Sequence, residues 1–170
     1  MPKILKNVRE QLLTEAKKQV FERGYSDTTI RSVAGACGLG VGTVYNYFES
    51  KEMLVAAFVY EDWKKYLSDI QRLPPNDSYV LLKGIYQALQ CFADDHKMLF
   101  SDAAAAKLVS VSSVDHHKML RDQIASFLLA VCPGGSPQFT AEFTAEALIH
   151  WSMENVDFET VYPLLAKILQ

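Results

Sequence analysis

Cysteine is scarce in this sequence, and its spacing excludes two classes of structure. The 170 residues contain three cysteines, Cys37, Cys91 and Cys132, and no two of them form a CxxC pair. We therefore predict reduced thiols, and neither a disulfide framework nor a zinc site. The adjacent His116 and His117 would point about 100° apart on a helix, which is poor chelating geometry. We expect no metal and no cofactor.

Long apolar runs are also absent. The residues after Met1–Lys6 form an amphipathic, charged stretch in place of the apolar core of a signal peptide, and no run reaches the length of a transmembrane helix. We therefore expect a soluble, cytoplasmic protein with no membrane partner. No segment alternates apolar and polar residues with a period of two, so we predict an all-α chain without a sheet.

The patterns that mark common enzyme classes are missing as well. The sequence has no nucleophile elbow, no phosphate-binding glycine loop and no closely spaced carboxylate pair in a loop. An enzyme built on Cys91 and His96 is a weak alternative, because residues five apart on a helix do not share a face. We therefore expect no catalytic residue and no enzymatic activity.

Positive charge is scarce overall but is unevenly distributed. The formal net charge is −3, yet residues 1–51 hold eight Lys or Arg against five acidic residues and carry +3, so that the remainder carries −6. A locally basic head on an acidic body is typical of a protein that binds DNA at matched sites. The alternative is that several of these lysines only solvate the first helix.

The stretch from Gly24 to Leu54 predicts two short helices around a tight turn. Thr28 or Thr29 supplies an N-cap hydroxyl, and an apolar stripe follows at i, i+3, i+4 and i+7, formed by Ile30, Val33, Ala34 and Cys37. The first helix should end at Gly38, where glycine accepts a positive φ. The second should begin near Gly40 or Val41.

The second short helix has one apolar side and one polar side. Val44 and Phe48 should pack inward with Leu39, which leaves Gly42, Thr43, Asn46 and Tyr47 on the opposite side. Such side chains suit DNA: Thr43 and Asn46 can bond base edges or phosphates, and the hydroxyls of Tyr45 and Tyr47 can donate to phosphates. Ser50 should cap the next helix, whose first turn carries Lys51 as a phosphate clamp.

From Leu12 onward these residues are similar to the N-terminal domain of TetR-family transcriptional regulators. The resemblance covers about the first third of the chain and includes Ala16, Phe21, Gly24-Tyr25, Thr28-Thr29-Ile30, Val33-Ala34, Gly38, Gly42-Thr43-Val44-Tyr45, Tyr47-Phe48 and Ser50-Lys51-Glu52. It implies a three-helix DNA-binding domain followed by a helical bundle for ligand binding and dimerisation. The DNA-contact set is then Thr28, Thr29, Gly40, Val41, Gly42, Thr43, Tyr45, Asn46, Tyr47 and Lys51.

The sequence departs from the family pattern at two of these positions. Gly40 stands where the family usually has Ser or Thr, so that a helix cap remains but a hydroxyl contact to DNA is lost. Val41 stands where a polar or basic residue is common, and it would touch a thymine methyl or nothing.

The rest of the chain predicts further helices separated by breakers. We expect helices at about 52–72, along the apolar stripe from Leu81 to Phe92, and at about 96–109. Another helix should end at the breaker formed by residues 132–137. Two more should follow at about 138–155 and 157–169, the last of them restarted or kinked at Pro163. The predicted domains are residues 1–50 for DNA binding and residues 51–170 for effector binding and dimerisation.

The family resemblance implies that the last two helices form a four-helix dimer interface. Its candidates are Phe139, Phe143, Ala147, Trp151, Val161, Leu164, Leu165 and Ile168, some of which must serve the core of the monomer. Candidates for lining an effector cavity are Phe58, Trp63, Tyr66, Tyr86, Cys91, Phe92, Phe100, Phe127 and Trp151, which favour an apolar or aromatic small molecule.

The function implied is a homodimeric, ligand-responsive transcriptional repressor that binds a palindromic double-stranded DNA operator and is released by a small molecule. The alternative is a DNA-binding or protein-interaction module of the same fold without an inducer.

Overall fold

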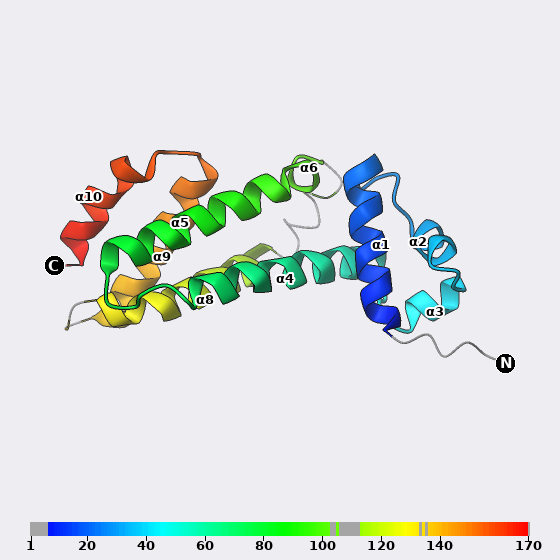
Figure 1. Ribbon diagram of the computed structural model, residues 1–170, viewed down its shortest axis with the longest axis horizontal. Coiled ribbons are helices and arrows are strands. Elements are labelled where there is room, and N and C mark those ends of the chain that lie inside the picture. The colour runs from blue at the N-terminus through cyan, green and yellow to red at the C-terminus, as the bar shows by residue number, and fades with distance from the viewer. Residues whose placement is uncertain (1–6, 103–104, 106–112, 133, 135, 170) are drawn as a thin grey trace. The chain divides into compact units, whose positions relative to one another are not determined.

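The chain folds into helices that form two compact units. The computed structural model describes residues 7–102, 105, 113–132, 134 and 136–169, and within these ranges every regular element is helical, as predicted (Figure 1). The first unit comprises Met1–Lys64 and His96–Ser110, and the second comprises Lys65–Asp95 and Val111–Gln170. The first unit therefore extends beyond the boundary between residues 50 and 51 that the sequence suggests.

The first unit is built around α1 (Val8–Arg23). Apolar residues four apart on this helix, Leu12, Ala16 and Val20, are at most 1% exposed and share one core. The other elements of this unit are α2 (Ile30–Ala36), α3 (Val41–Tyr45), most of α4 (Lys51–Ile70) and α6 (Lys97–Phe100). Residues of α2, α3 and α4 complete the core with Val33, Val44 and Leu54.

A tight turn at Gly38 joins α2 to α3. Gly38 has φ +67°, its N–H donates to the Gly35 carbonyl at 3.1 Å, and the Leu39 N–H donates to the Ala34 carbonyl at 2.8 Å. These two bonds form a Schellman motif, which satisfies carbonyls that the end of a helix would otherwise leave unpaired. The predicted stop at Gly38 is confirmed.

The helix α3 is short, and its inner side chains hold it in place. Val44 and Phe48 are buried and Leu39 packs beside them, as predicted. The helix ends at Tyr45, whereas the sequence suggests a helical stretch up to Phe48. Residues 46 and 47 form a turn in which the Phe48 N–H still donates to the Val44 carbonyl at 3.0 Å, so that Phe48 keeps its place in the core.

The predicted helix at 96–109 is wrong as a continuous element. The helix α6 ends at Phe100, and the Ala105 N–H donates to the Asp102 carboxylate at 3.2 Å, which is the bond that an aspartate makes when it caps the start of a helix. Residues 103–104 and 106–112 lie outside the described part.

Before α6, buried His96 places Nε2 3.3 Å from Asp62 Oδ2, and Lys17 Nζ is 2.6 Å from the same oxygen.

The second unit contains α5 (Ser78–Asp95), α8 (Ser113–Leu128), a short 3₁₀ turn η1 (Leu129–Val131), α9 (Pro137–Met153) and α10 (Phe158–Ile168). The helix α9 packs against both α8 and α5, and α10 packs against α5 and α9. As predicted, the last helix begins after Asp157, whose carboxylate accepts the Glu159 N–H at 3.3 Å. Across the described ranges, no helix has the length and apolar content needed to cross a lipid bilayer.

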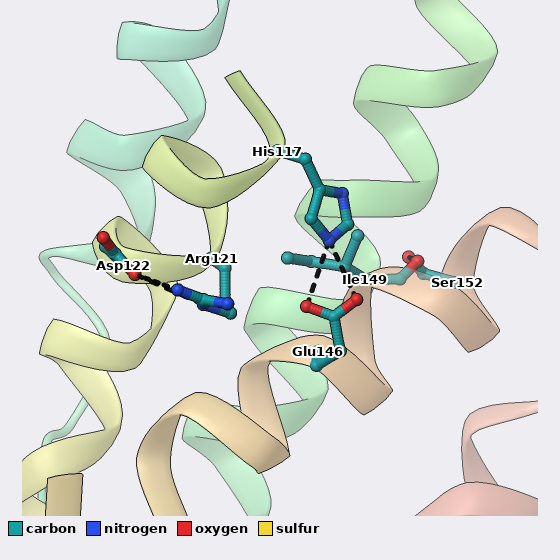
Figure 2. Close-up of polar contacts among 6 residues, drawn as sticks. All are labelled: His117, Arg121, Asp122, Glu146, Ile149 and Ser152. Carbon is teal, nitrogen blue, oxygen red and sulfur yellow. Dashed lines mark hydrogen bonds and ion pairs between the residues drawn. The ribbon is translucent and has the colours of Figure 1, made fainter. Parts of the chain in front are cut away.

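A polar bridge joins α8 to α9 (Figure 2). His117 Nε2 lies 2.8 Å and 3.0 Å from the two carboxylate oxygens of Glu146, while the neighbouring Arg121 pairs with Asp122 on its own helix at 3.0 Å. The cluster resembles a metal site only superficially, because no group of three or more His, Cys, Asp or Glu side chains suited to a metal occurs in the part of the chain that the structure describes.

The turn between α2 and α3 provides a test of the fold. A Cβ at Gly38 would meet no atom within 4 Å, so Gly38→Ala should destabilise the protein by about 1–2 kcal/mol only through its left-handed backbone. Gly42→Ala is the matched control, because Gly42 has equal space and a helical backbone, and it should leave stability unchanged or raise it by up to about 1 kcal/mol. Urea unfolding measures both, and equal effects of the two substitutions would contradict this account.

Candidate nucleic-acid interface

The outer face of α3 exposes two aromatic residues. Tyr45, the last residue of α3, is 51% exposed, and Tyr47, in the turn that follows, is 48% exposed. Gly42 and Asn46 are exposed on this surface, and Thr43 is half-buried. The buried side of α3 keeps these two tyrosines exposed to solvent. Each tyrosine offers a hydroxyl donor and a flat apolar ring.

The two threonines before α2 have different roles. Thr29 is exposed and is the N-cap: its hydroxyl oxygen accepts the Ser32 N–H at 3.0 Å, and Ser32 Oγ accepts the Thr29 N–H at 3.1 Å, which forms a capping box. Thr28 is buried, and its hydroxyl donates to the Gly24 carbonyl at 2.9 Å. Thr28 therefore supports the turn, and its hydroxyl is already bonded within the protein.

An open hollow of about 350 Å³ lies beside α3. It is lined by Thr28, Thr29, Ile30, Arg31, Val41, Tyr45 and Lys51. Five of these residues were predicted from the sequence, whereas Arg31 and Ile30 were not assigned to the site. The position of Arg31 in the first turn of α2, outside the apolar stripe, is the signal that could have identified it. Its exposed guanidinium gives the hollow a permanent positive charge.

Lys51 is held in place by the loop that follows α1. Its Nζ donates to the Tyr25 carbonyl at 3.0 Å and lies 3.8 Å from the centroid of the Tyr25 ring. The buried Tyr25 hydroxyl donates to Glu52 at 2.8 Å, and burial followed by this carboxylate raises the pKa of Tyr25. The pKa of Glu52 is lowered, chiefly by its own backbone N–H and then by Ser50 and Tyr25. As predicted, Ser50 caps α4, with its Oγ accepting the Met53 N–H at 3.2 Å.

Gly40 and Val41, at the start of α3, differ in their exposure to solvent. Gly40 is exposed and precedes α3 without a side-chain cap. Val41 is half-buried and packs against the core of the first unit, so that only part of its side chain reaches the hollow.

The structure divides the predicted dimer residues between a core and a surface. Val161 and Leu165 are 6% and 3% exposed, so these two serve the core of the second unit and not an outer face. Ala147 is half-buried. The remaining members are exposed on α9 and α10 and form what we call the α9–α10 apolar face: Phe139, Phe143, Trp151, Leu164 and Ile168.

The predicted effector residues fall in both units. Phe58, Trp63 and Phe100 belong to the first unit, and Tyr66, Tyr86, Cys91, Phe92, Phe127 and Trp151 belong to the second. Within the second unit the Tyr66 and Phe92 rings meet edge to face at 5.7 Å. Tyr86 is fully buried, with its hydroxyl donated to the Val156 carbonyl at 2.7 Å. Cys91 lines an open hollow of about 410 Å³ with Gln87, Gln90, Asp94 and Asn155, which is a polar lining.

Comparison with known proteins supports this interpretation of the first unit. Residues 12–58 match the family model described as bacterial regulatory proteins of the tetR family. The HTH-type transcriptional repressor DhaR of Mycobacterium sp. (strain GP1) is 35% identical over 65 residues, which cover 38% of this chain and 31% of that protein. The matching region spans about a third of the length of the curated relatives it matches first.

Solved structures share the fold over nearly the whole chain. The TetR family repressor AlkX from Dietzia sp. strain DQ12-45-1b has a TM-score of 0.66 at 18% identity, covering 97% of this chain and 98% of that one. A TetR-family regulator from Pectobacterium atrosepticum has a TM-score of 0.63 at 21% identity, covering 95% and 88%. From α1 to the first part of α4 this chain is therefore similar to bacterial regulatory proteins of the tetR family, and it shares the helical fold of these structures beyond that region.

Proposed function

We propose that this protein is a homodimeric regulator of transcription, most simply a repressor, that inserts α3 into the major groove of a palindromic operator. The observation that carries the proposal is the exposed pair Tyr45 and Tyr47 beside a hollow that contains Arg31 and Lys51. Hydroxyl and cationic donors beside a short helix can bind the backbone phosphates of DNA while the helix lies in the major groove. The name of DhaR as a repressor supports the sign of regulation.

Phosphate contacts position the reading head under this proposal. The guanidinium of Arg31 can bind a phosphate through two N–H donors, and the hydroxyls of Tyr45 and Tyr47 add neutral bonds. Lys51 contributes charge from a fixed position, because its ammonium already bonds the Tyr25 carbonyl. Thr28 has a supporting role only, since its hydroxyl is donated to Gly24.

Base contacts come from α3 and from Asn46, the residue that directly follows it. Asn46 is exposed and its amide can bond the two edge atoms that adenine presents in the major groove. Thr43 can bond either kind of base edge. Gly42 lacks a side chain, so that the backbone of α3 can approach the floor of the groove closely.

The dimer is proposed to form through the α9–α10 apolar face. Five large apolar residues exposed on two adjoining helices exceed what isolated surface positions explain, and such a patch is typical of an interface. Two subunits related by a two-fold axis would present their α3 helices about 34–36 Å apart, which matches successive major grooves and requires a palindromic operator.

The effector is proposed to be a small apolar or aromatic molecule that binds in the second unit. The aromatic residues Tyr66, Phe92 and Phe127 support this class of ligand. Such a ligand would bind more tightly to a dimer whose α3 helices are spaced too widely or too narrowly for DNA. It would weaken DNA binding by the difference between its affinities for the two spacings.

The proposal is tested by selecting bound sequences from a random DNA pool and repeating the selection with candidate apolar and aromatic compounds. A palindromic consensus that a compound releases is the expected result. If no sequence is enriched, the protein does not bind DNA sequence-specifically and the proposal is wrong. A consensus that no compound releases would favour the alternative of a regulator without a small-molecule inducer.

Two substitutions separate charged from neutral phosphate contacts. Arg31→Ala should weaken binding to every sequence and reduce the slope of log affinity against log salt by about 0.9, because one phosphate is no longer neutralised. Tyr47→Phe should weaken binding about two- to tenfold without changing that slope, because it removes one neutral hydrogen bond. Titrations followed by fluorescence anisotropy at several salt concentrations measure both. An unchanged slope for Arg31→Ala would remove Arg31 from the interface.

Asn46 should determine sequence preference. Asn46→Ala should relax the consensus at one base pair of each half-site and cost about 1–3 kcal/mol against the wild-type operator, with little effect on non-specific DNA. Repeating the selection with the variant measures the change. The exposed Glu49, which follows α3, provides the control Glu49→Ala, which should preserve the consensus. If both variants select the wild-type consensus, the assignment of Asn46 to a base edge is wrong.

If the proposed interface is correct, one charged side chain within it should dissociate the dimer. Phe143 is 49% exposed on the α9–α10 apolar face, so Phe143→Glu should convert the dimer to folded monomers at micromolar concentration and abolish tight operator binding. Light scattering measures the mass of the variant. The control Val80→Glu, at a 38% exposed position on α5 outside this face, should remain dimeric. A dimeric Phe143→Glu protein would place the interface elsewhere.

A further inference from the structure

Gln19 is a buried glutamine in α1 whose side chain reaches α2. It is 6% exposed, in a stretch of helix where Ala16 and Val20 form the apolar core. Its Nε2 donates to Glu15 Oε1 at 2.7 Å and to the Ser32 carbonyl at 3.3 Å, and its Oε1 accepts from Ser32 Oγ at 2.6 Å. The guanidinium of Arg23 also donates to Oε1. A buried amide that uses both of its ends is fully satisfied.

Ser32 connects this amide to the cap of α2. Its Oγ accepts the Thr29 N–H at 3.1 Å, and its backbone N–H donates to the Thr29 hydroxyl at 3.0 Å. The single hydroxyl hydrogen of Ser32 faces two acceptors, Gln19 Oε1 at 2.6 Å and the Thr29 carbonyl at 2.8 Å. The contact with Gln19 therefore orients the same hydroxyl that completes the capping box.

Directional bonds constrain α2 in a way that its apolar contacts do not. Burial of Ile30, Val33 and Ala34 favours any orientation that removes these side chains from water, because the hydrophobic effect has no direction. Hydrogen bonds weaken steeply when their angles change. Two bonds from Gln19 to Ser32 therefore select one rotation of α2 about its axis. Thr29 and Arg31, which line the hollow, move with that rotation.

We propose that Gln19 is a positioning residue that fixes the rotation of α2 against α1 and thereby sets the affinity of the reading head for its operator. The proposal rests on the proposed function, because it concerns the geometry of the same DNA-reading surface. It differs from a contribution to stability. An apolar group of similar shape in place of Gln19 should cost little stability, because Ser32 Oγ keeps its bonds with the N–H and carbonyl of Thr29, whereas the geometric selectivity of the amide is lost.

The test replaces the amide with an apolar side chain of equal length. Gln19→Met should keep the thermal stability of the full-length protein at or above that of the wild type and lower its affinity for the selected operator about fivefold to tenfold. Gln11→Met is the matched control, since Gln11 lies on the same helix with an exposed side chain, and it should change neither quantity. Gln19→Leu repeats the test if the methionine variant folds poorly.

A double-mutant cycle identifies the route of the effect. Ser32→Ala should also lower operator affinity, and the double variant with Gln19→Met should lose less than the product of the two single losses, because both changes remove the same bond. Losses that multiply would show that Gln19 acts by another route and would overturn the proposal.

Hydrogen exchange tests the positioning without DNA. In Gln19→Met, the Ser32 amide should exchange faster than in the wild type, while amides in the middle of α1 keep their protection. Unchanged exchange at Ser32, or unchanged operator affinity in a variant that is otherwise folded, overturns the proposal. If the wild type selects no DNA sequence, the proposed function fails, and the exchange experiment still decides whether Gln19 fixes α2.

Discussion

The burial of Val44 and Phe48 is the constraint on which the rest of the reading head depends. A helix of five residues has no stability of its own in water, because the first turn costs more conformational entropy than one hydrogen bond recovers. The helix α3 exists because these two side chains are held in a core with Val33 and Leu12. Once these two side chains are fixed, the last turn of α3 and the turn that joins it to Phe48 must direct the residues between them outward. The exposure of Tyr45, Asn46 and Tyr47 is therefore a consequence of core packing.

The sequence predicts this part of the fold well because its signals are local. A threonine cap, an apolar stripe at helical spacing and a glycine at the turn all act within about ten residues, and each one specifies backbone geometry directly. Thr29 and Gly38 have the roles that their residue types suggest. The charge asymmetry between residues 1–51 and the rest likewise follows from composition alone.

The features that the sequence does not predict depend on contacts between distant residues. Gln19 and Ser32 are 13 positions apart, and Lys51 reaches a carbonyl 26 positions away. The division of α10 into a buried side with Val161 and Leu165 and an exposed side with Leu164 and Ile168 depends on where α5 and α9 lie. Apolar periodicity marks all four residues alike. The break after α6 has a local mark that sequence periodicity does not register, since Asp102 accepts the Ala105 N–H in the manner of a helix N-cap.

The contact between Lys51 and Tyr25 has a consequence for the entropy of binding. A lysine on a solvated surface samples many rotamers, and fixing it on a ligand costs up to about 2 kcal/mol of conformational entropy. Here the ammonium already lies 3.8 Å above an aromatic ring and bonds a carbonyl, so that most of this entropy is lost when the protein folds. An anion that enters the hollow would meet a charge whose position is already set, and the ordering of that side chain would add little to the cost of association.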